Sequence, residues 1–304
     1  MKVSSSLLIA SLVWLVALNT VASPVELRIP KPRSDLDTAH NYYTDLLRKA
    51  LIKAAGERPV PVLLPIMEME QDRAVKELVR GRTIDIFWMG PDQRRNTQLR
   101  VIPIPLERGL MGYRQFIVHR QRAAEFDQVR SLADLQKFSA CQGTHWPDTD
   151  ILRAAQLAVK TSTGYESLFK QVAAGRCDYF PRGFHEIRIE MTKRAAEFPE
   201  LIAYEPLILH YPFAVYFYVR QDNELLADWV QQGLEKMIDD GELLVHMQQH
   251  QHTRRAFPLI ANTPRRLLEI PNNQLPDAET FNEPRYWFQA SDFVALEPPP
   301  PQTP

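Results

Sequence analysis

Short apolar runs alternate with amphipathic stretches along the first 90 residues of the chain. The strands that this pattern predicts lie at residues 25–29, 59–66 and 83–89, and the helices at residues 38–55 and 70–80. A glycine stands at the end of each predicted helix, Gly56 after the first and Gly81 after the second. Residues 83–89 are almost entirely apolar, as expected for a strand covered on both faces. Strands that alternate with helices in this way predict a parallel α/β sheet.

A second α/β run follows an extended segment that contains Pro103 and Pro105. It follows a strand at 113–119 and occupies residues 138–198. After it come extended segments at 201–204 and 212–219 and a long amphipathic helix at 222–240. The pattern therefore predicts two α/β lobes, with the chain leaving the first near 107–112 and returning near 209–214. Two crossings form a hinge, and hinged lobes close around ligands.

The boundaries that follow place residues 23–110 and 212–304 in lobe 1 and residues 111–211 in lobe 2. The end of the chain is rich in Pro, Asn and Arg, which favours an irregular strap held by the aromatic residues 286–288.

The N-terminus has the layout of a secretory signal peptide. Lys2 precedes an apolar stretch at residues 7–18, and small residues lead to a cleavage site after Ala22. The stretch is shorter than the roughly 20 residues that a membrane-spanning helix needs. We expect residues 1–22 to be removed and the mature chain to lie in the bacterial periplasm; an uncleaved anchor is the alternative.

The charge of the chain is close to balanced, with 36 Lys and Arg against 37 Asp and Glu. Nucleic acid is therefore not an expected partner, because no basic excess is present to neutralise a phosphate backbone. The sequence contains no Gly-x-Ser-x-Gly elbow, Walker loop or dinucleotide fingerprint. We expect no catalytic residues and no cofactor, and so a protein that is not an enzyme.

Two cysteines, Cys141 and Cys177, occupy short predicted strands. An oxidising compartment permits a disulfide between them, but a free buried Cys behaves as a small apolar residue, so both alternatives stay open. The helix near the end of lobe 1 carries His246 and His250 on one face, a spacing that can bind a metal. No third ligand stands out beside them, so we expect a solvated helix and no metal site.

Several short motifs occur in an order and at spacings that together are more specific than any one of them. They are residues 83–86 (TIDI), 90–94 (GPDQR), 142–144 (QGT), 175–179 (GRCDY), 211–215 (YPFAV) and 240–243 (DGEL). Through them the chain resembles the type II periplasmic binding proteins, and within these the amino-acid-binding class, over residues 25–250. The resemblance implies a two-lobed type II fold with a two-crossing hinge.

The resemblance also implies a ligand site between the lobes. In that family an Arg and a Gly-Thr turn bind the ligand's carboxylate, and here the corresponding residues are Arg94, Gly143 and Thr144. Arg95 is the alternative if the alignment slips by one. A guanidinium offers a bidentate fork to a carboxylate, and backbone N–H groups at a helix start favour an anion.

One position departs from the family's pattern. The family holds the ligand's ammonium group with a carboxylate, and the corresponding position here is Gly183, next to Arg182. Arg182 would make the cleft doubly positive, which favours an anionic ligand. Four aromatic residues are candidates for stacking on the apolar part of a ligand, although packing in the core is the commoner role of such residues. They are Trp88, Tyr113, Trp146 and Phe180.

These observations predict a monomeric periplasmic protein that captures a small anionic or zwitterionic solute. The solute would be an amino-acid-like molecule or an organic acid, handed to an ABC-type inner-membrane transporter or presented to a sensor protein. The alternatives are a ligand-free sensor or adaptor that acts through protein contacts, and an enzyme built on the same fold.

Overall fold

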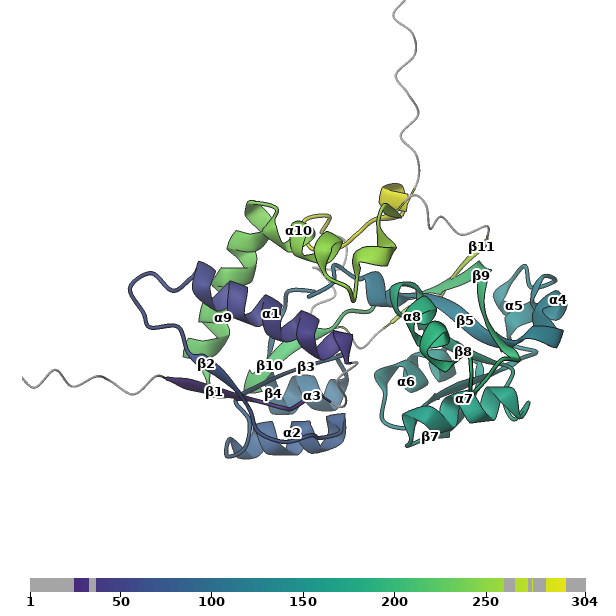
Figure 1. Cartoon of the computed structure of the whole chain (residues 1–304), viewed down its shortest axis with the longest axis horizontal. Helices are drawn as coiled ribbons and strands as arrows, with labels where there is room; N and C mark the ends of the chain where they lie inside the picture. Colours follow the sequence, from purple (N-terminus) through teal and green to yellow (C-terminus); the bar gives the residue numbers. More distant parts are fainter. Residues whose placement is uncertain (1–24, 33–36, 260–265, 273–274, 276–282, 294–304) are drawn as a thin grey trace, which may run out of the picture.

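Two α/β lobes lie side by side, joined by crossing segments (Figure 1). The computed structural model describes residues 25–32, 37–259, 266–272, 275 and 283–293. The predicted signal peptide, residues 1–22, lies outside the described residues. Within these residues, no helix is both long and apolar enough to span a membrane.

Lobe 1 is built from the two ends of the described chain. Its first part contains β1 (Glu26–Ile29), α1 (Thr38–Lys53), β2 (Val62–Pro65), α2 (Gln71–Arg80), β3 (Ile86–Met89), α3 (Gln93–Gln98) and β4 (Leu99–Ile102). Its second part contains β10 (Tyr216–Arg220), α9 (Glu224–Asp239), α10 (Glu242–Gln249) and η3 (Arg254–Ala256). Strand β1 pairs in parallel with β2, and β10 lies antiparallel between β3 and β4.

Close helix packing joins the two parts of lobe 1. Helix α9 crosses α1 at Gly233, where a Cβ atom would collide with the backbone carbonyl of Ala50. The predicted apolar face of α1 is buried, with Tyr42, Leu46 and Leu47 fully inaccessible to solvent. The returning chain thus completes a core that residues 25–102 begin.

Lobe 2 is centred on a six-stranded sheet in the order β11-β9-β5-β8-β6-β7. Its elements in chain order are η1 (Leu110–Gly112), β5 (Tyr113–His119), η2 (Arg120–Arg122), α4 (Ala123–Phe126), α5 (Leu132–Leu135), β6 (Ser139–Gly143), α6 (Pro147–Ala154), β7 (Ala158–Ser162), α7 (Tyr165–Ala173), β8 (Tyr179–Gly183), α8 (Phe184–Arg194) and β9 (Leu201–His210). Strands β7, β6 and β8 are parallel, and β5 runs antiparallel to both β8 and β9. Cys141 and Cys177 form a disulfide within this lobe, with Cα atoms 5.6 Å apart, which resolves the alternative left open by the sequence.

The two crossing segments lie against each other between the lobes. Leu106 N–H donates to the Val215 carbonyl at 3.0 Å, and Tyr211 N–H donates to the Gly112 carbonyl at 3.2 Å. A Cβ atom at position 112 would collide with the Tyr211 carbonyl, so glycine permits this close approach.

The prediction that residues 212–304 belong to lobe 1 is wrong for one strand. Strand β11 (Arg266–Glu269) pairs in parallel with β9 and so extends the sheet of lobe 2. Four residues carry no signal of which sheet they will join, because strand pairing depends on the tertiary fold.

The strap predicted for the end of the chain contacts the first crossing. Phe288 N–H donates to the Arg108 carbonyl at 2.9 Å, and Trp287 is buried over Gly109. In lobe 1, Tyr286 donates to Glu235 of α9 at 2.8 Å, whereas Phe293, in η6 (Ala290–Phe293), contacts the ring of Tyr113 in lobe 2.

Candidate functional site

A cleft of about 840 Å³ lies between the two lobes. Lobe 1 contributes residues from the starts of α2 and α3, and lobe 2 contributes the turn between β6 and α6 together with the first turns of α6. The lining residues are Asp72, Asp92, Gln93, Arg94, Asn96, Thr97, Thr144, His145, Trp146, Pro147, Asp150 and Leu275. The volume is in the range of small-molecule sites, about 300–1,000 Å³.

The lobe 1 wall of the cleft depends on helix α3, a helix that the sequence pattern did not predict. Asp92 caps this six-residue helix by accepting from the Arg95 N–H at 2.7 Å. The helix directs Arg94 outward into the cleft lining, with about half of its side chain exposed, and Arg95 inward. A single short turn has too few residues to show an amphipathic period, so the Asp cap was the only local signal.

Arg94 and Arg95 have different surroundings. Arg94 forms an ion pair with Asp72 at 2.8 Å, and both residues line the cleft. Arg95 is 1% exposed, pairs with Asp92 at 2.8 Å and donates to the Gly90 carbonyl at 2.7 Å. It also donates to the carbonyl of His145 at 3.2 Å, a hydrogen bond that joins lobe 1 to lobe 2. Arg94 is thus the accessible cation, and Arg95 supports the wall behind it.

The lobe 2 wall differs from the expected anion-binding turn. The N–H of Gly143 donates to Gln142 Oε1 at 3.2 Å, and the N–H of Thr144 donates to the Ser162 carbonyl at 3.0 Å. Hydrogen bonds within lobe 2 thus already use the two N–H groups that the resemblance would offer to a ligand carboxylate. Thr144 itself is exposed in the cleft lining, whereas Gly143 is buried beneath the indole of Trp146.

The start of α6 carries negative charge of its own. Asp148 and Asp150 both lie in its first turn, where a carboxylate complements the partial positive charge of the helix N-terminus. Asp148 is buried, but Asp150 lines the cleft and is 68% exposed; its ion pair with Arg153 is long, at 4.0 Å. The start of α6 consequently attracts an incoming anion less strongly than a helix start without acidic residues would.

Arg182 lies within lobe 2 and not in the cleft lining. Its guanidinium contacts two carboxylates of α8, Glu186 at 2.9 Å and Glu190 at 2.7 Å. Burial alone would lower the pKa of Arg182, but these two carboxylates raise it above its usual range. The doubly positive cleft expected from Arg94 and Arg182 is thus not formed, because Arg182 is held between two anions of its own lobe.

The four aromatic candidates fall into two groups. Trp146 lines the cleft and stacks on Phe180 behind it, with ring centroids 6.2 Å apart. Phe180 is fully buried in the core of lobe 2, and Trp88 packs edge-on against His40 in lobe 1. Tyr113 stacks on His210 beside the hinge at 4.1 Å. Only Trp146 of these four is positioned to contact a solute in the cleft.

Comparison with known proteins gives matches only among solved structures: no family model and no curated protein matches the chain. One structural match is a mutant of ArgBP from T. maritima, which is 15% identical, with a TM-score of 0.50 over 69% of this chain and 84% of that one. Another is an amino acid ABC transporter substrate-binding protein from Streptococcus pneumoniae bound to L-arginine, which is 16% identical, with a TM-score of 0.50 over 69% of this chain and 82% of that one.

The chain has the two-lobed periplasmic binding protein fold. This confirms the fold class that the resemblance implied. At these identities the likeness concerns the fold, so the chemistry of the site rests on the cleft residues of this chain.

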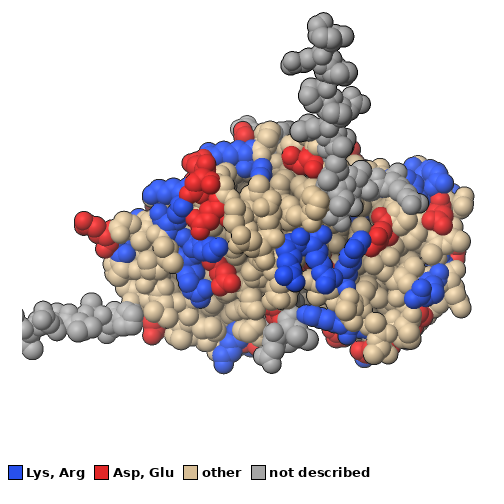
Figure 2. All heavy atoms as spheres, turned by 45° about the horizontal axis from the view of Figure 1, so that its top comes forward, with Lys and Arg blue, Asp and Glu red and all other residues tan. Residues whose placement is uncertain are grey.

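Charged residues of both signs are present over the surface. Figure 2 shows Lys and Arg gathered near the middle of one face, with acidic side chains on both sides of them. The cleft lining itself has an acidic excess, with Asp72, Asp92 and Asp150 against Arg94.

Proposed function

We propose that this chain is a periplasmic binding protein that captures a small zwitterionic solute, amino-acid-like in its chemistry, in the cleft between its lobes. The observation that carries the proposal is the cleft itself, which is lined from both lobes and lies beside a two-crossing hinge. Closing the lobes would bring Arg94 and Asp72 of one wall toward Thr144, Trp146 and Asp150 of the other.

The charges in the cleft favour a zwitterion over a purely anionic solute. Arg94 offers a guanidinium to a carboxylate, and Asp150 offers a largely unpaired carboxylate to an ammonium group. Asp150 therefore supplies, from another position, the acid that is missing at Gly183. The indole of Trp146 adds an apolar surface between these charged groups.

Among zwitterions, amino acids with a cationic side chain are the first candidates. Asp150 lacks a close cation, and Asp72 would keep only Lys76 once a solute carboxylate takes Arg94, so two carboxylates of the lining can face positive charge on the solute. A structural neighbour that was solved with bound L-arginine agrees with this choice. The solute would then pass to an inner-membrane transporter or be presented to a sensor protein.

Thermal unfolding of the purified protein against basic, neutral and acidic amino acids, dicarboxylates and short peptides tests the proposal. A solute at about 100 times its Kd should stabilise the fold by about 2.7 kcal/mol. Arg94→Ala and Asp150→Asn should each abolish the shift in midpoint, whereas Arg48→Ala, an exposed charge on α1, should keep it. Solute capture is overturned if no member of the panel shifts the midpoint, or if both cleft variants respond as the wild type does.

A further inference from the structure

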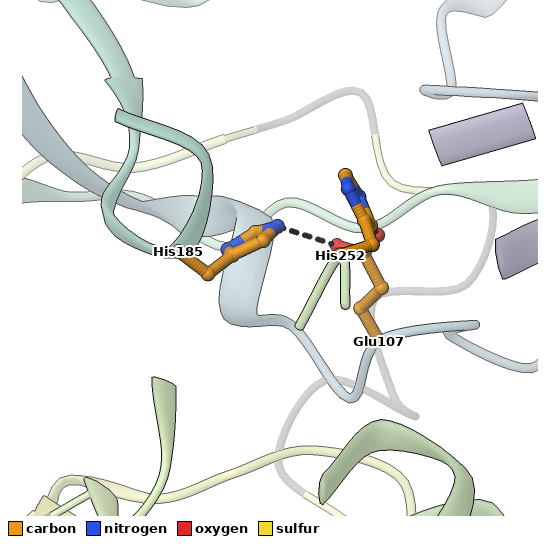
Figure 3. A group of neighbouring side chains, drawn as sticks. All are labelled: Glu107, His185 and His252. Atoms are coloured by element: carbon orange, nitrogen blue, oxygen red, sulfur yellow. Dashed lines mark hydrogen bonds and ion pairs between the residues drawn. The ribbon is translucent and has the colours of Figure 1, made fainter. Parts of the chain in front are cut away.

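Three buried side chains meet beside the hinge, away from the cleft lining: Glu107, His185 and His252 (Figure 3). Their exposed fractions are 0%, 1% and 3%. Glu107 belongs to the first crossing segment, His185 to the first turn of α8 in lobe 2, and His252 to the segment after α10 in lobe 1. The cluster thus joins the hinge to both lobes.

The donor atoms of the cluster converge on one point. His185 Nε2 lies 3.4 Å from Glu107 Oε2, and His252 Nε2 lies 3.2 Å from Glu107 Oε1. One donor atom from each residue can be chosen so that all three lie within 4.8 Å of one another. Four ligands at Zn–N distances of 2.0–2.1 Å are separated by about 3.3 Å in a tetrahedron, so the two shorter separations already match zinc coordination.

Several of these atoms lack a hydrogen-bond partner among the described residues. They are Glu107 Oε2 and both ring nitrogens of His185, and all are inaccessible to solvent. A buried polar atom left without a partner destabilises a fold by about 1–3 kcal/mol, so such atoms call for an explanation. A bound cation would give a partner to Glu107 Oε2 and to Nε2 of His185, the ring nitrogen that faces Glu107.

Other side chains hold the cluster in place. The Tyr43 hydroxyl donates to Glu107 Oε1 at 2.6 Å, and His252 Nδ1 lies 3.3 Å from Thr38 Oγ1. Contacts of this kind orient the ligands of metal sites, because they fix the ring rotation and leave Nε2 for the metal. Here Nε2 of His252 is the nitrogen that faces Glu107.

We propose that Glu107, His185 and His252 form a binding site for a divalent transition-metal ion, with Zn²⁺ the best match. Two imidazoles and one carboxylate are a known zinc ligand set, and three protein ligands leave a fourth position open. One carboxylate and two neutral imidazoles carry a single negative charge, which partly neutralises the ion. Because the ligands come from the hinge and both lobes, the bound ion would also clamp the lobes in the arrangement described.

Titration of Zn²⁺ into chelator-treated protein, in competition with a chromophoric chelator, tests the site. We expect one tight equivalent in the wild type, and its loss in Glu107→Gln and in His252→Gln. His119→Gln, which removes an imidazole at the end of β5 outside the cluster, should keep the equivalent. The proposal is overturned if the wild type binds no tight equivalent, or if the cluster variants bind as the wild type does.

Co²⁺ provides a readout that needs no variant, in case the substituted chains fail to fold. A tetrahedral nitrogen and oxygen site gives intense visible absorption, whereas hydrated, octahedral Co²⁺ absorbs weakly. We expect one equivalent of Co²⁺ to give the intense spectrum, and Zn²⁺ to abolish it by displacement. A weak octahedral spectrum at every ratio would mean that Co²⁺ stays hydrated, which overturns the proposed tetrahedral site.

Discussion

Arg114 and Asp148 form a buried ion pair in lobe 2, with Nη2 and Oδ1 2.6 Å apart. Arg114 lies in β5, directly after the hinge, and Asp148 lies in the first turn of α6, whose start forms one wall of the cleft. The hydroxyl of Tyr211, in the return crossing, donates to the same Asp148 oxygen at 2.5 Å. The pair therefore connects β5 and the return crossing to the cleft wall.

Replacing Asp148 with Asn should destabilise the protein strongly. Arg114 is 3% exposed, and removing its partner leaves an uncompensated buried charge, which costs about 3–5 kcal/mol. Urea unfolding measures the loss. Asp150→Asn is the matched control on the same helix, because Asp150 is 68% exposed, and we expect its stability to change by less than about 0.5 kcal/mol. Equal stability of the two variants would show that the Arg114 pair is not formed in solution.

Arg182 should behave as a structural residue of lobe 2. Arg182→Met leaves Glu186 and Glu190 without their shared cation, and their side chains are only 12% and 13% exposed. We expect a loss of about 3–5 kcal/mol in unfolding free energy. Arg188→Met is the control, since its pair with Glu205 is about half exposed and worth about 0–1 kcal/mol. An Arg182→Met protein that unfolds like the wild type would return Arg182 to the list of ligand candidates.

The sequence predicts the features that depend on neighbouring residues, and it fails for those that depend on contacts between distant segments of the chain. Local signals predicted the elements: the apolar period of α1, the apolar run of β3 and the glycines after α1 and α2. The order of the short motifs along the chain then predicted the fold. The helix α3 was missed because its only local mark is the Asp92 cap. Strand β11 itself was assigned to the wrong lobe, because strand pairing is decided by the tertiary fold.

The candidate site was predicted less completely, for the same reason. Arg94, Thr144 and Trp146 line the cleft, but the sequence could not show that Arg182 has two acidic neighbours one and two turns along α8 that fold back onto it. The surroundings of the histidines were likewise not evident from the sequence. The helix with His246 and His250 was expected to be solvated, yet His246 is 4% exposed and packs on Tyr42. The cluster at Glu107 brings together segments that are far apart in the sequence.

The disulfide between Cys141 and Cys177 should contribute substantially to stability. It closes a loop across 36 residues of sequence separation, for which loop-closure entropy gives about 4 kcal/mol. Urea unfolding of oxidised protein, compared with the Cys141→Ala/Cys177→Ala double variant, measures this contribution. Two titratable thiols in denatured, unreduced protein would contradict the disulfide, and a stability difference near zero would contradict the magnitude.

The pair of Asp72 and Arg94 predicts how the cleft responds to pH and to a solute. Lys76 foremost, and Arg94 after it, hold the pKa of Asp72 at about 2. A carboxyl whose pKa is lower in the folded state than in the unfolded chain stabilises the fold above its unfolded pKa, about 3.9, and this contribution is lost as the pH falls toward 2. Arg94→Ala should therefore raise the pKa of Asp72, and the single variant Lys76→Ala should raise it by more than Arg94→Ala does, because Lys76 is the larger cause of the shift. Carbon-detected NMR of the side-chain carboxyls measures both shifts.

The same carboxyl reports solute binding. If a solute carboxylate takes the guanidinium of Arg94, Asp72 loses one of its two cations, and its pKa should rise on saturation even in the wild type. In Arg94→Ala the solute should leave the pKa of Asp72 unchanged, which makes that variant the control. A solute that binds and stabilises the fold without moving the Asp72 titration would place its carboxylate elsewhere in the cleft, and Arg94 would then be a cation of the wall and not a ligand contact.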